Sequence, residues 1–574
     1  MTRVSPAARL ALTGAALVLL SSFNTPSIPW AGAPLAVAAW CCLIAAWTAA
    51  RRARVRAVPP PAGAAWAVWQ DIADLARPRL ARPQGPAKSG GKRPGALLLG
   101  LWPESGAPLF IDDDQASAHV LVLGPSGTGK TAGVIAPNVL LRDPARESAV
   151  VLDVKTGSRS LWNVTAGRYG ARAHLFCPLF EGSIRYNPLD RVRDIGDAQR
   201  AAALLVHNTT PRDLSGDAQV YASAATDLAA LLFLHVQHDR TAGGHTVGAV
   251  YRILLGGAGT VRAVLSGSPV AAVRERAGVF AARERRVREA AVTGLLQRLA
   301  AWGDPAVDEA TAGSWDLGRL GREPAALYIL LPEPDAARLQ PLAALLVADL
   351  LDTLIDQADR GERRCPVRLY LDEFRRFGYL AGLSDRLPTL RERGVSVLLG
   401  AQVVSQIEEV YGQRDARTLI ANTETKLLFR AGDLETARLV SAWLGQTTVP
   451  LISRTVGPHG ARATVHPYVR PLALPEDVAR MPDRTVVALA GARRPAVLRQ
   501  ARYFEPPVGA LLARPIAPPP FPLRTRTSGG ARGATASGTA VSILTAGSSA
   551  RQERPGRPAA GRQAAPRPLG GVTI

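Results

Sequence analysis

The sequence predicts an α/β fold in which helices cover both faces of a parallel sheet. Apolar segments that look like buried strands, residues 119–123, 149–155 and 365–374, each end in polar or glycine-rich sequence. Stretches with helical spacing alternate with them, which is typical of a parallel sheet. In such folds ligands bind at the carboxyl ends of the strands, so we expect the functional site there.

A membrane anchor is predicted at residues 1–56. Residues 10–23 are apolar, and residues 31–50 supply twenty positions without a charge after a turn-like segment that contains two prolines. Two spans joined by a small loop fit this pattern, although the first also resembles a signal peptide in length. Arginines precede the first span and follow the second, so the positive-inside rule places the rest of the chain in the cytoplasm.

Two further segments differ in composition from the rest of the chain. Residues 57–94 are rich in Pro, Gly, Ala and Arg, which is typical of a juxtamembrane linker, here with one short helix. Residues 506–574 contain nine arginines, one acid and no lysine among Pro, Gly, Ala, Ser and Thr, so we expect a disordered basic tail. Such a tail either contacts nucleic acid or a partner protein, or is only a solvated extension.

The charge balance suggests an anionic partner. The 574 residues carry a net charge of +22, which suits nucleic acid or the cytoplasmic leaflet of a membrane. Four cysteines, two of them adjacent in an apolar segment, have neither metal-ligand spacing nor the pattern of a disulfide framework. This pattern argues against a zinc-dependent or disulfide-stapled protein and fits a main body in the reducing cytosol.

The most specific motif is a phosphate-binding loop of the form G-x-x-x-x-G-K-[ST], which follows the first predicted strand. Its backbone N–H groups would face phosphates, Lys130 would reach the β and γ phosphates, and Thr131 would coordinate Mg²⁺. The chain has only five lysines among 69 basic residues, yet it keeps lysine here. The sequence therefore predicts bound ATP with Mg²⁺. The predicted nucleotide-binding residues are Gly124, Pro125, Ser126, Gly127, Thr128, Gly129, Lys130 and Thr131.

Polar residues at two later strand ends complete a predicted hydrolytic site. Asp372 would hold the Mg²⁺ ion, and Glu373 would orient and deprotonate the water that attacks the γ-phosphate. Gln402 ends an apolar strand at residues 395–402 and could sense the γ-phosphate, or it could only cap a turn. An apolar run followed by Asp-Glu is common on protein surfaces. These two acids therefore indicate a hydrolytic site only in combination with the phosphate-binding loop.

Arginines close the helix that lies between these two strands. Arg391 or Arg393 could act as an arginine finger in the site of a neighbouring subunit. Either could equally be a helix-end cation that interacts with the helix dipole.

These motifs resemble those of the type IV secretion coupling proteins, the TraG/TraD-like inner-membrane ATPases of conjugation systems. Further stretches look like the family's motifs and follow the family's order: residues 134–140, 185–189, 371–374, Gln402 with Gln406, and 470–472 with Tyr503 and Phe504. Two departures stand out. The family's Asp-Pro-Lys-Gly-Glu is Asp-Val-Lys-Thr-Gly at residues 153–157, without the Pro and the Glu, and Tyr221 stands where a Trp is expected.

The resemblance implies a RecA-like motor domain made of residues 95–190 and 322–505, with an all-helical domain at residues 191–321 inserted into it. It also implies that Arg391 is the trans-acting finger and Gln402 the coupling glutamine. In the inserted segment, arginines between residues 274 and 288 could face phosphates, but acids alternate with them. An ion-paired helix face is therefore the expectation there.

The function implied is that of a multi-pass inner-membrane ATPase, which recruits a nucleoprotein and drives DNA transfer through a type IV secretion channel. The implied partners are DNA, single-stranded with a bound relaxase, together with the channel proteins, the membrane and further copies of the chain in a homo-hexamer. Two alternatives stay open. One is an anchored ATPase for protein export or for septal double-stranded DNA pumping, and the other is a non-hydrolysing, nucleotide-dependent docking platform.

Overall fold

The computed structural model describes residues 63–76, 96–210, 215–239, 244–380, 382–457 and 460–511. The predicted membrane spans lie outside these residues, as do most of the predicted linker and nearly all of the predicted tail. The predictions of two spans and of a disordered tail are therefore not tested by the structure.

The described residues contain a sheet of eleven strands in the order β2-β1-β13-β12-β9-β3-β8-β7-β4-β6-β5. The seven strands from β9 to β5 are all parallel, and β12, β13, β1 and β2 extend the sheet in antiparallel fashion. This confirms the predicted α/β class with a large, mostly parallel sheet. The strands are β1 (Leu97–Leu101), β2 (Pro108–Ile111), β3 (Val120–Leu123), β4 (Ser148–Asp153), β5 (Ala173–Phe176), β6 (Ala326–Leu330), β7 (Val367–Leu371), β8 (Val395–Ala401), β9 (Thr425–Leu428), β12 (Thr485–Ala490) and β13 (Ala496–Arg499).

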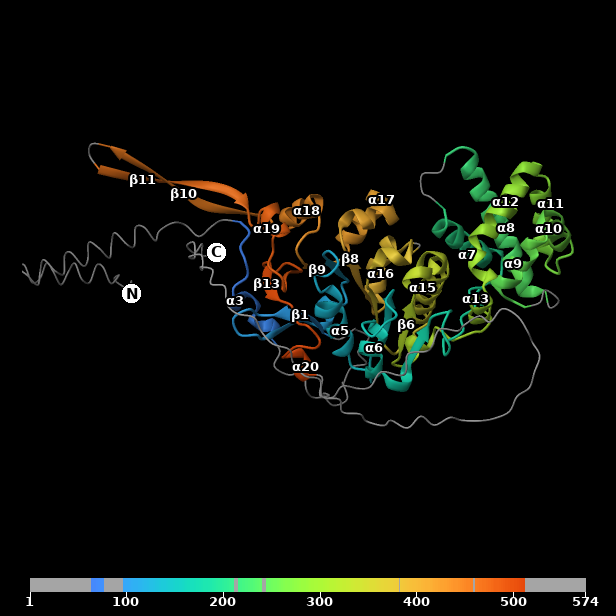
Figure 1. Cartoon of the computed structure of the whole chain (residues 1–574), viewed down its shortest axis with the longest axis horizontal. Coiled ribbons are helices and arrows are strands. Elements are labelled where there is room, and N and C mark those ends of the chain that lie inside the picture. The colour runs from blue at the N-terminus through green and yellow to red at the C-terminus, as the bar shows by residue number, and fades with distance from the viewer. Residues whose placement is uncertain are drawn as a thin grey trace, which may run out of the picture. The chain divides into compact units, whose positions relative to one another are not determined.

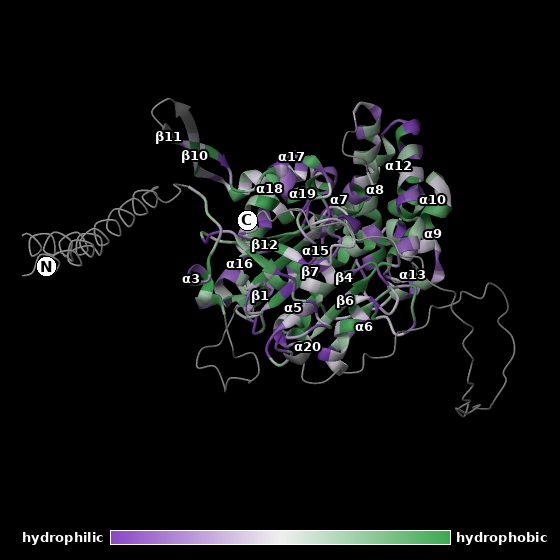
Figure 2. Cartoon of the chain, turned by 60° about the vertical axis from the view of Figure 1, so that its left-hand side comes forward, coloured by the Kyte–Doolittle hydropathy of each residue, from purple (hydrophilic) through white to green (hydrophobic). Residues whose placement is uncertain are grey.

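Helices cover both faces of this sheet (Figure 1). Successive residues of a strand face opposite sides, so β3 serves two cores. Val120 and Val122 pack on the side of η2, α5 and α6, whereas Leu121 and Leu123 pack on the side of α15 to α18. The apolar residues gather in the strands and in the helices beside them (Figure 2). The covering helices are η2 (Thr131–Ile135), α5 (Ala136–Leu140), α6 (Leu161–Thr165), α15 (Ala336–Asp359), α16 (Leu383–Glu392), α17 (Val404–Ala421) and α18 (Leu434–Leu444).

Short helical elements connect the strands and cover the ends of the chain that the structure describes. Residues 69–75, within the predicted linker, form α3 and η1 and pack on the turn between β12 and β13, where Arg493 pairs with Asp74 at 2.7 Å. These elements are α3 (Trp69–Ile72), η1 (Ala73–Leu75), α4 (Asp113–Ala116), η3 (Ala166–Arg168), η4 (Gly170–Arg172), η6 (Glu333–Asp335), η7 (Phe374–Phe377), α19 (Pro475–Ala479) and α20 (Val508–Leu511).

Between β5 and β6 the regular elements of the described chain are helices. Helix α8 lies at the centre of this segment and packs against α7, α9, α11 and α12. Among the described residues, α8 alone is long and apolar enough to cross a membrane, but 61% of its most apolar stretch is buried in the protein, as in a core helix. The helices are α7 (Ile195–Asn208), α8 (Asp217–His238), α9 (Val247–Leu255), α10 (Gly257–Ser266), α11 (Ala271–Ala281), α12 (Arg285–Arg298), η5 (Ala300–Gly303), α13 (Pro305–Ala310) and α14 (Arg319–Arg322).

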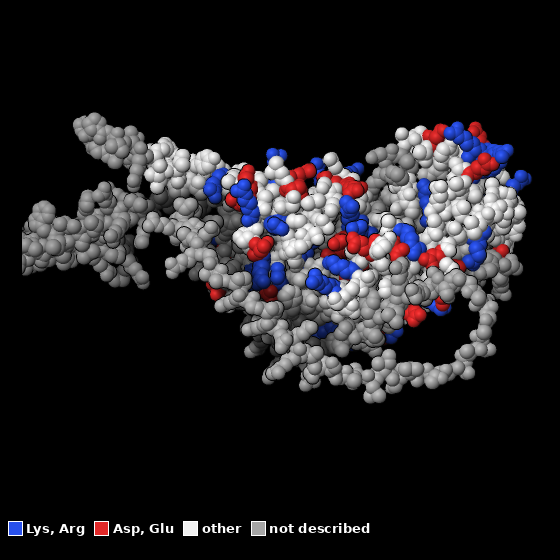
Figure 3. Space-filling model, in the orientation of Figure 1, with Lys and Arg blue, Asp and Glu red and all other residues white. Residues whose placement is uncertain are grey.

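The predicted ion-paired face of this helical segment is present in part, because Arg285 pairs with an alternating acid whereas Arg274 and Arg288 donate to backbone carbonyl oxygens. Arg285 lies 2.8 Å from Glu289, and Arg283 lies 2.5 Å from Asp227. On the face shown in Figure 3, basic and acidic residues are mixed over this part of the molecule. This face is therefore not a uniformly basic patch of the kind that grips phosphates.

Strands β10 (Gln446–Gly457) and β11 (Gly460–Pro471) form a separate antiparallel hairpin (Figure 1). The sequence did not predict these strands, because Pro450 and Pro467 interrupt their apolar residues. The base of the hairpin is tied to the start of the described chain, where Gly63 bridges to Thr447 and Ala64 donates its N–H to the Gln446 carbonyl at 2.7 Å.

Candidate nucleotide-binding site

The predicted phosphate loop connects the carboxyl end of β3 to η2 and α5. Gly124 donates its N–H to the carbonyl oxygen of Ala401 at 3.1 Å, which holds the loop against the end of β8. Gly127 and Gly129 have φ angles of 81° and 94°, in the left-handed region that favours glycine. Ser126 at the tip of the loop is exposed. The loop therefore has the bend that its motif requires, and its last residue leads directly into a helix.

Lys130 is buried between the loop and the predicted acids. Its ammonium donates to the carbonyl oxygens of Gly124 at 2.5 Å and Pro125 at 3.1 Å. Burial lowers the pKa of Lys130, while the charges of Asp372 and Glu373 raise it. The lysine and both acids are thus close enough to interact electrostatically, as their positions at neighbouring strand ends predict.

The two predicted magnesium ligands are in direct contact. The Thr131 hydroxyl donates to the carboxylate of Asp372 at 2.6 Å, and Asp372 is only 2% exposed. Lys155, which was not among the predicted site residues, lies 3.6 Å from the same carboxylate and donates to the Thr131 hydroxyl at 3.3 Å. A hydroxyl beside a carboxylate is a donor set that suits Mg²⁺, which prefers oxygen ligands and keeps several waters. The residues present therefore fit the ion that the loop motif implies.

Asp153 explains how the altered motif at residues 153–157 still shapes the site. Asp153 is the last residue of β4. Its carboxylate accepts hydrogen bonds from the N–H groups of Lys155 at 3.0 Å and Leu161 at 2.7 Å. Burial and, after it, the nearby charge of Asp372 raise the pKa of Asp153 to about 6. Asp153 thus holds the turn that positions Lys155, and neither contact requires the Pro and Glu that this chain lacks.

Glu373 and Gln402 follow the ends of two adjacent strands, β7 and β8. Glu373 has a φ of 52°, a left-handed conformation that costs on the order of 1 kcal/mol for a residue other than glycine. Its carboxylate is half-buried and lies 3.8 Å from the guanidinium of Arg376. Gln402 comes directly after Ala401, the residue that binds the loop, and its N–H donates to the Gln406 side chain at 3.4 Å. The structure thus brings both residues to the edge of the sheet that carries the loop.

Comparison with known proteins agrees with this arrangement. The family described as "Type IV secretory system Conjugative DNA transfer" matches residues 69–521. The chain belongs to this family. It is a type IV secretion coupling protein of conjugative DNA transfer.

Its relatives include the conjugal transfer protein TraG of Escherichia coli, 26% identical over 478 residues that make up 74% of this chain and 72% of the relative. The protein VirD4 of Rhizobium rhizogenes is 24% identical over 405 residues, 67% of this chain and 58% of the relative. Among solved structures, the bacterial conjugative coupling protein TrwB superposes with a TM-score of 0.61 at 19% identity, covering 81% of this chain and 96% of that chain. TrwB in complex with ADP and Mg²⁺ gives a TM-score of 0.57 at 20% identity, covering 76% and 93%.

Arg391 of this coupling protein is not near the phosphate loop of its own chain. It lies at the end of α16, exposed, with its guanidinium 3.3 Å from the carboxylate of Glu424. Arg391 also lies close enough to His119 for its charge to lower the pKa of that histidine. His119 precedes β3 and the loop follows β3, so Arg391 sits at the opposite end of the strand. Its predicted role in the site of a neighbouring subunit stays a prediction.

Gln500 contacts the phosphate loop, although no motif in the sequence points to it. It follows β13, is 4% exposed and donates its side-chain N–H to the carbonyl oxygen of Thr128 at 2.8 Å. A Cβ added at Gly129 would lie only 2.7 Å from the Gln500 side-chain oxygen, so the glutamine packs directly on the loop backbone. Residues 372 positions apart meet here, and no local motif marks the glutamine.

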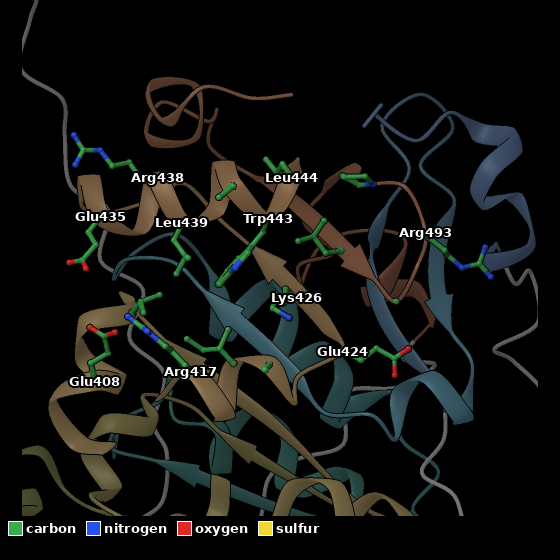
Figure 4. Close-up of a pocket in the computed structure, with 17 residues that line it drawn as sticks. Glu408, Arg417, Glu424, Lys426, Glu435, Arg438, Leu439, Trp443, Leu444 and Arg493 are labelled. Atoms are coloured by element: carbon green, nitrogen blue, oxygen red, sulfur yellow. The ribbon is translucent and has the colours of Figure 1, made fainter. Parts of the chain in front are cut away.

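A hollow of about 910 Å³ lies between α17, α18 and the turn that follows β12 (Figure 4). Its lining includes Lys426, whose ammonium lies 5.6 Å from the centre of the Trp443 ring, and the acids Glu408, Glu424 and Glu435. None of the predicted nucleotide or magnesium residues lines it. The candidate site is therefore defined by the loop and the neighbouring strand ends, not by this hollow.

Proposed function

We propose that this coupling protein binds ATP with Mg²⁺ and hydrolyses it to drive DNA transfer through a type IV secretion channel. The observation that carries the proposal is the cluster of Lys130, Thr131, Asp372 and Lys155 at the carboxyl ends of β3, β4 and β7. The related protein TrwB has been solved with ADP and Mg²⁺ and with a non-hydrolysable ATP analogue.

Each residue of the site has a role that follows from its position. The loop N–H groups and Lys130 bind phosphate oxygens, and Thr131 and Asp372 hold the metal. Bound Mg²⁺ would neutralise charge on the phosphate oxygens. Glu373 orients the attacking water and accepts its proton, since it follows the metal ligand directly and is partly open to solvent. Gln402 links the site to β8 and α17, so a change around the γ-phosphate can reach those elements.

The finer parts of the proposal concern assembly and partners. We infer a homo-hexamer in which Arg391 of one subunit contacts the nucleotide site of the next. Arg391 lies at the opposite end of β3 from the phosphate loop of its own chain, so it cannot reach a phosphate bound there. Single-stranded DNA with a bound relaxase is the proposed substrate, and the net charge of +22 suits a partner held through its phosphates. The same proposal includes a membrane anchor of two spans within residues 1–56. It also includes a motor domain made of residues 95–190 and 322–505, with a helical domain at residues 191–321.

The test is ATP hydrolysis by the full chain in lipid nanodiscs, with and without single- and double-stranded DNA, over a salt series. Hydrolysis that DNA stimulates, and that loses this stimulation as salt rises, is expected because contacts with phosphates release counterions. Turnover that is indifferent to DNA would favour protein export. ATP binding without turnover would favour the docking platform.

A further inference from the structure

The hairpin formed by β10 and β11 exposes apolar side chains on both of its faces. Five such residues are between 49% and 58% exposed, and we call them the hairpin surface: Leu451, Ile452, Val465, Tyr468 and Val469. Ile452 lies opposite Val465 in the ladder, and Leu451, one position away, faces the other side. A two-stranded hairpin is marginally stable in water by itself, and an exposed apolar patch marks an interaction site. A partner that can cover both faces is therefore required.

The composition of the hairpin shows what kind of partner suits it. Residues 446–471 include three arginines and neither aspartate nor glutamate, whereas the chain as a whole has 47 acids against 69 basic residues. Apolar side chains combined with an excess of positive charge are typical of segments that bind anionic lipid. A DNA partner would match the charge but not the aliphatic side chains.

The attachment of the hairpin places it where the chain meets the membrane anchor that we propose. Gly63 and Ala64 pair with Thr447 and Gln446 at the hairpin base. Twelve residues separate this point from the end of the second predicted span at residue 50, a distance of at most about 45 Å in an extended chain. Close by, Trp69 is 38% exposed, and tryptophan favours membrane interfaces.

Two features of the backbone limit where the hairpin can go. Pro450 and Pro467 face each other in the ladder and cannot donate N–H groups, which disfavours addition of a further strand from another copy. The edges of a two-stranded sheet also carry unpaired backbone groups, which the hydrocarbon core does not tolerate. The headgroup layer satisfies both limits, because it offers hydrogen-bond partners as well as apolar contact.

We propose that the β10–β11 hairpin lies in the anionic headgroup layer of the membrane beside the anchor, with the hairpin surface in contact with lipid. The position of the hairpin relies on the anchor in the proposed function, but the contact does not depend on ATP hydrolysis. A failure of the lipid contact and a failure of hydrolysis are therefore distinguishable.

The test places an environment-sensitive fluorophore on the full chain in nanodiscs. Tyr468→Cys and Val469→Cys put the label on opposite faces of the hairpin, and Val279→Cys, 66% exposed on α11, is the matched control. The unsubstituted chain gives the background from native cysteines, of which Cys177 and Cys365 are buried. Nanodiscs of phosphatidylcholine alone are compared with nanodiscs that contain phosphatidylglycerol, each with and without a spin label on the lipid headgroup.

We expect both hairpin labels to emit at shorter wavelength and to lose at least half of their intensity to the headgroup spin label, more strongly when phosphatidylglycerol is present. The label on α11 should show neither effect. Emission typical of water at both hairpin positions would overturn the proposal. Emission shifted to shorter wavelength without quenching from the lipid would also overturn it, because a protein, and not the membrane, would then cover the hairpin.

Discussion

The buried ionisable residues at the two ends of β3 differ in their charge state. At the carboxyl end, Lys130 and Asp372 are buried beside further polar partners, so charges are kept inside the protein in a connected group. At the amino end, His119 is 2% exposed, and burial is the main cause that lowers its pKa to about 4, so it is neutral at pH 7. Burial therefore does not by itself mark a functional group. The difference is that Lys130 and Asp372 keep charges that a ligand can use, whereas His119 is neutral. The buried charge near His119, that of Arg368, is bound to a backbone carbonyl.

Replacing Lys130 with alanine tests the charged end most directly. We expect kcat for ATP to fall by on the order of a thousandfold, because a buried cation directed at phosphate is lost. Steady-state hydrolysis and thermal unfolding should be measured together, since the fold should survive. Lys426→Ala is the matched control, because Lys426 is also partly buried but lies in the hollow beside α18. Turnover by Lys130→Ala at the rate of the control would refute the site.

Glu373→Gln tests whether the same end carries out proton transfer. We expect kcat to fall by at least about a hundredfold, since the amide cannot accept the proton of the attacking water. ATP binding, followed with a fluorescent analogue, should be retained. Glu409 lies on α17 and pairs with Arg375 of η7. The control variant Glu409→Gln should leave kcat unchanged. If both variants behave alike, Glu373 has no special role.

The amino end should show itself in the pH dependence of stability. The folded pKa of His119, about 4, lies below its ordinary value of 6.5, so the unfolded chain binds the proton first as pH falls. The contribution of His119 is complete above pH 6.5 and is lost as the pH falls toward 4, by about 3 kcal/mol in all. Urea unfolding at pH 7.5 and pH 5.0 should show a smaller difference for His119→Asn than for the wild type. His466→Asn, an exposed histidine of the hairpin, should not change the difference.

Gln500→Ala sharpens the comparison by loosening the loop without removing a charge. The Thr128 carbonyl loses a buried partner, which should cost about 1 kcal/mol of stability and weaken ATP binding several-fold. Isothermal titration with a non-hydrolysable analogue would measure the binding. Gln413→Ala, at an exposed position in α17, is the control. Equal affinities for the two variants would show that Gln500 only fills space.

Arg391→Ala should have the smallest effect on the isolated subunit. Its ion pair with Glu424 is exposed, and such pairs contribute about 0–1 kcal/mol. In assemblies mixed with wild type, however, activity should fall faster than the fraction of variant if Arg391 serves a neighbouring site. Arg319→Ala, which breaks a similarly exposed pair with Glu323, is the control. A linear loss of activity with mixing ratio would argue against a role in trans.

The parts of the site that sequence could predict depend on short motifs or on strand ends. The loop is a contiguous motif, and Thr131 and Asp372 meet although they are 241 positions apart, because parallel strands bring their carboxyl ends together. Predicted strand limits were less accurate: residues 149–155 were predicted as one strand, but β4 stops at Asp153, whose side chain bonds to the following turn.

The parts that sequence could not predict depend on tertiary contacts without a local pattern. Gln500 reaches the loop because β13 joins the antiparallel part of the sheet, an arrangement that no spacing reveals. The hairpin was missed because Pro450 and Pro467 are typical of loops, whereas here they face each other in a ladder. The position of Arg391 relative to the loop depends on how α16 packs against β8, which a motif carried over from a family cannot supply.

The helical segment leaves the sheet from β5, its outermost strand, and the chain returns in β6, the strand next to it. The pairing of the strands in the sheet therefore stays the same when the length or the helices of this segment change. Over evolutionary time, helices can therefore be gained, lost or exchanged there while the ATP-binding edge stays intact. A change in one contiguous stretch of the gene can thus alter this segment and leave the site at the sheet edge as it is.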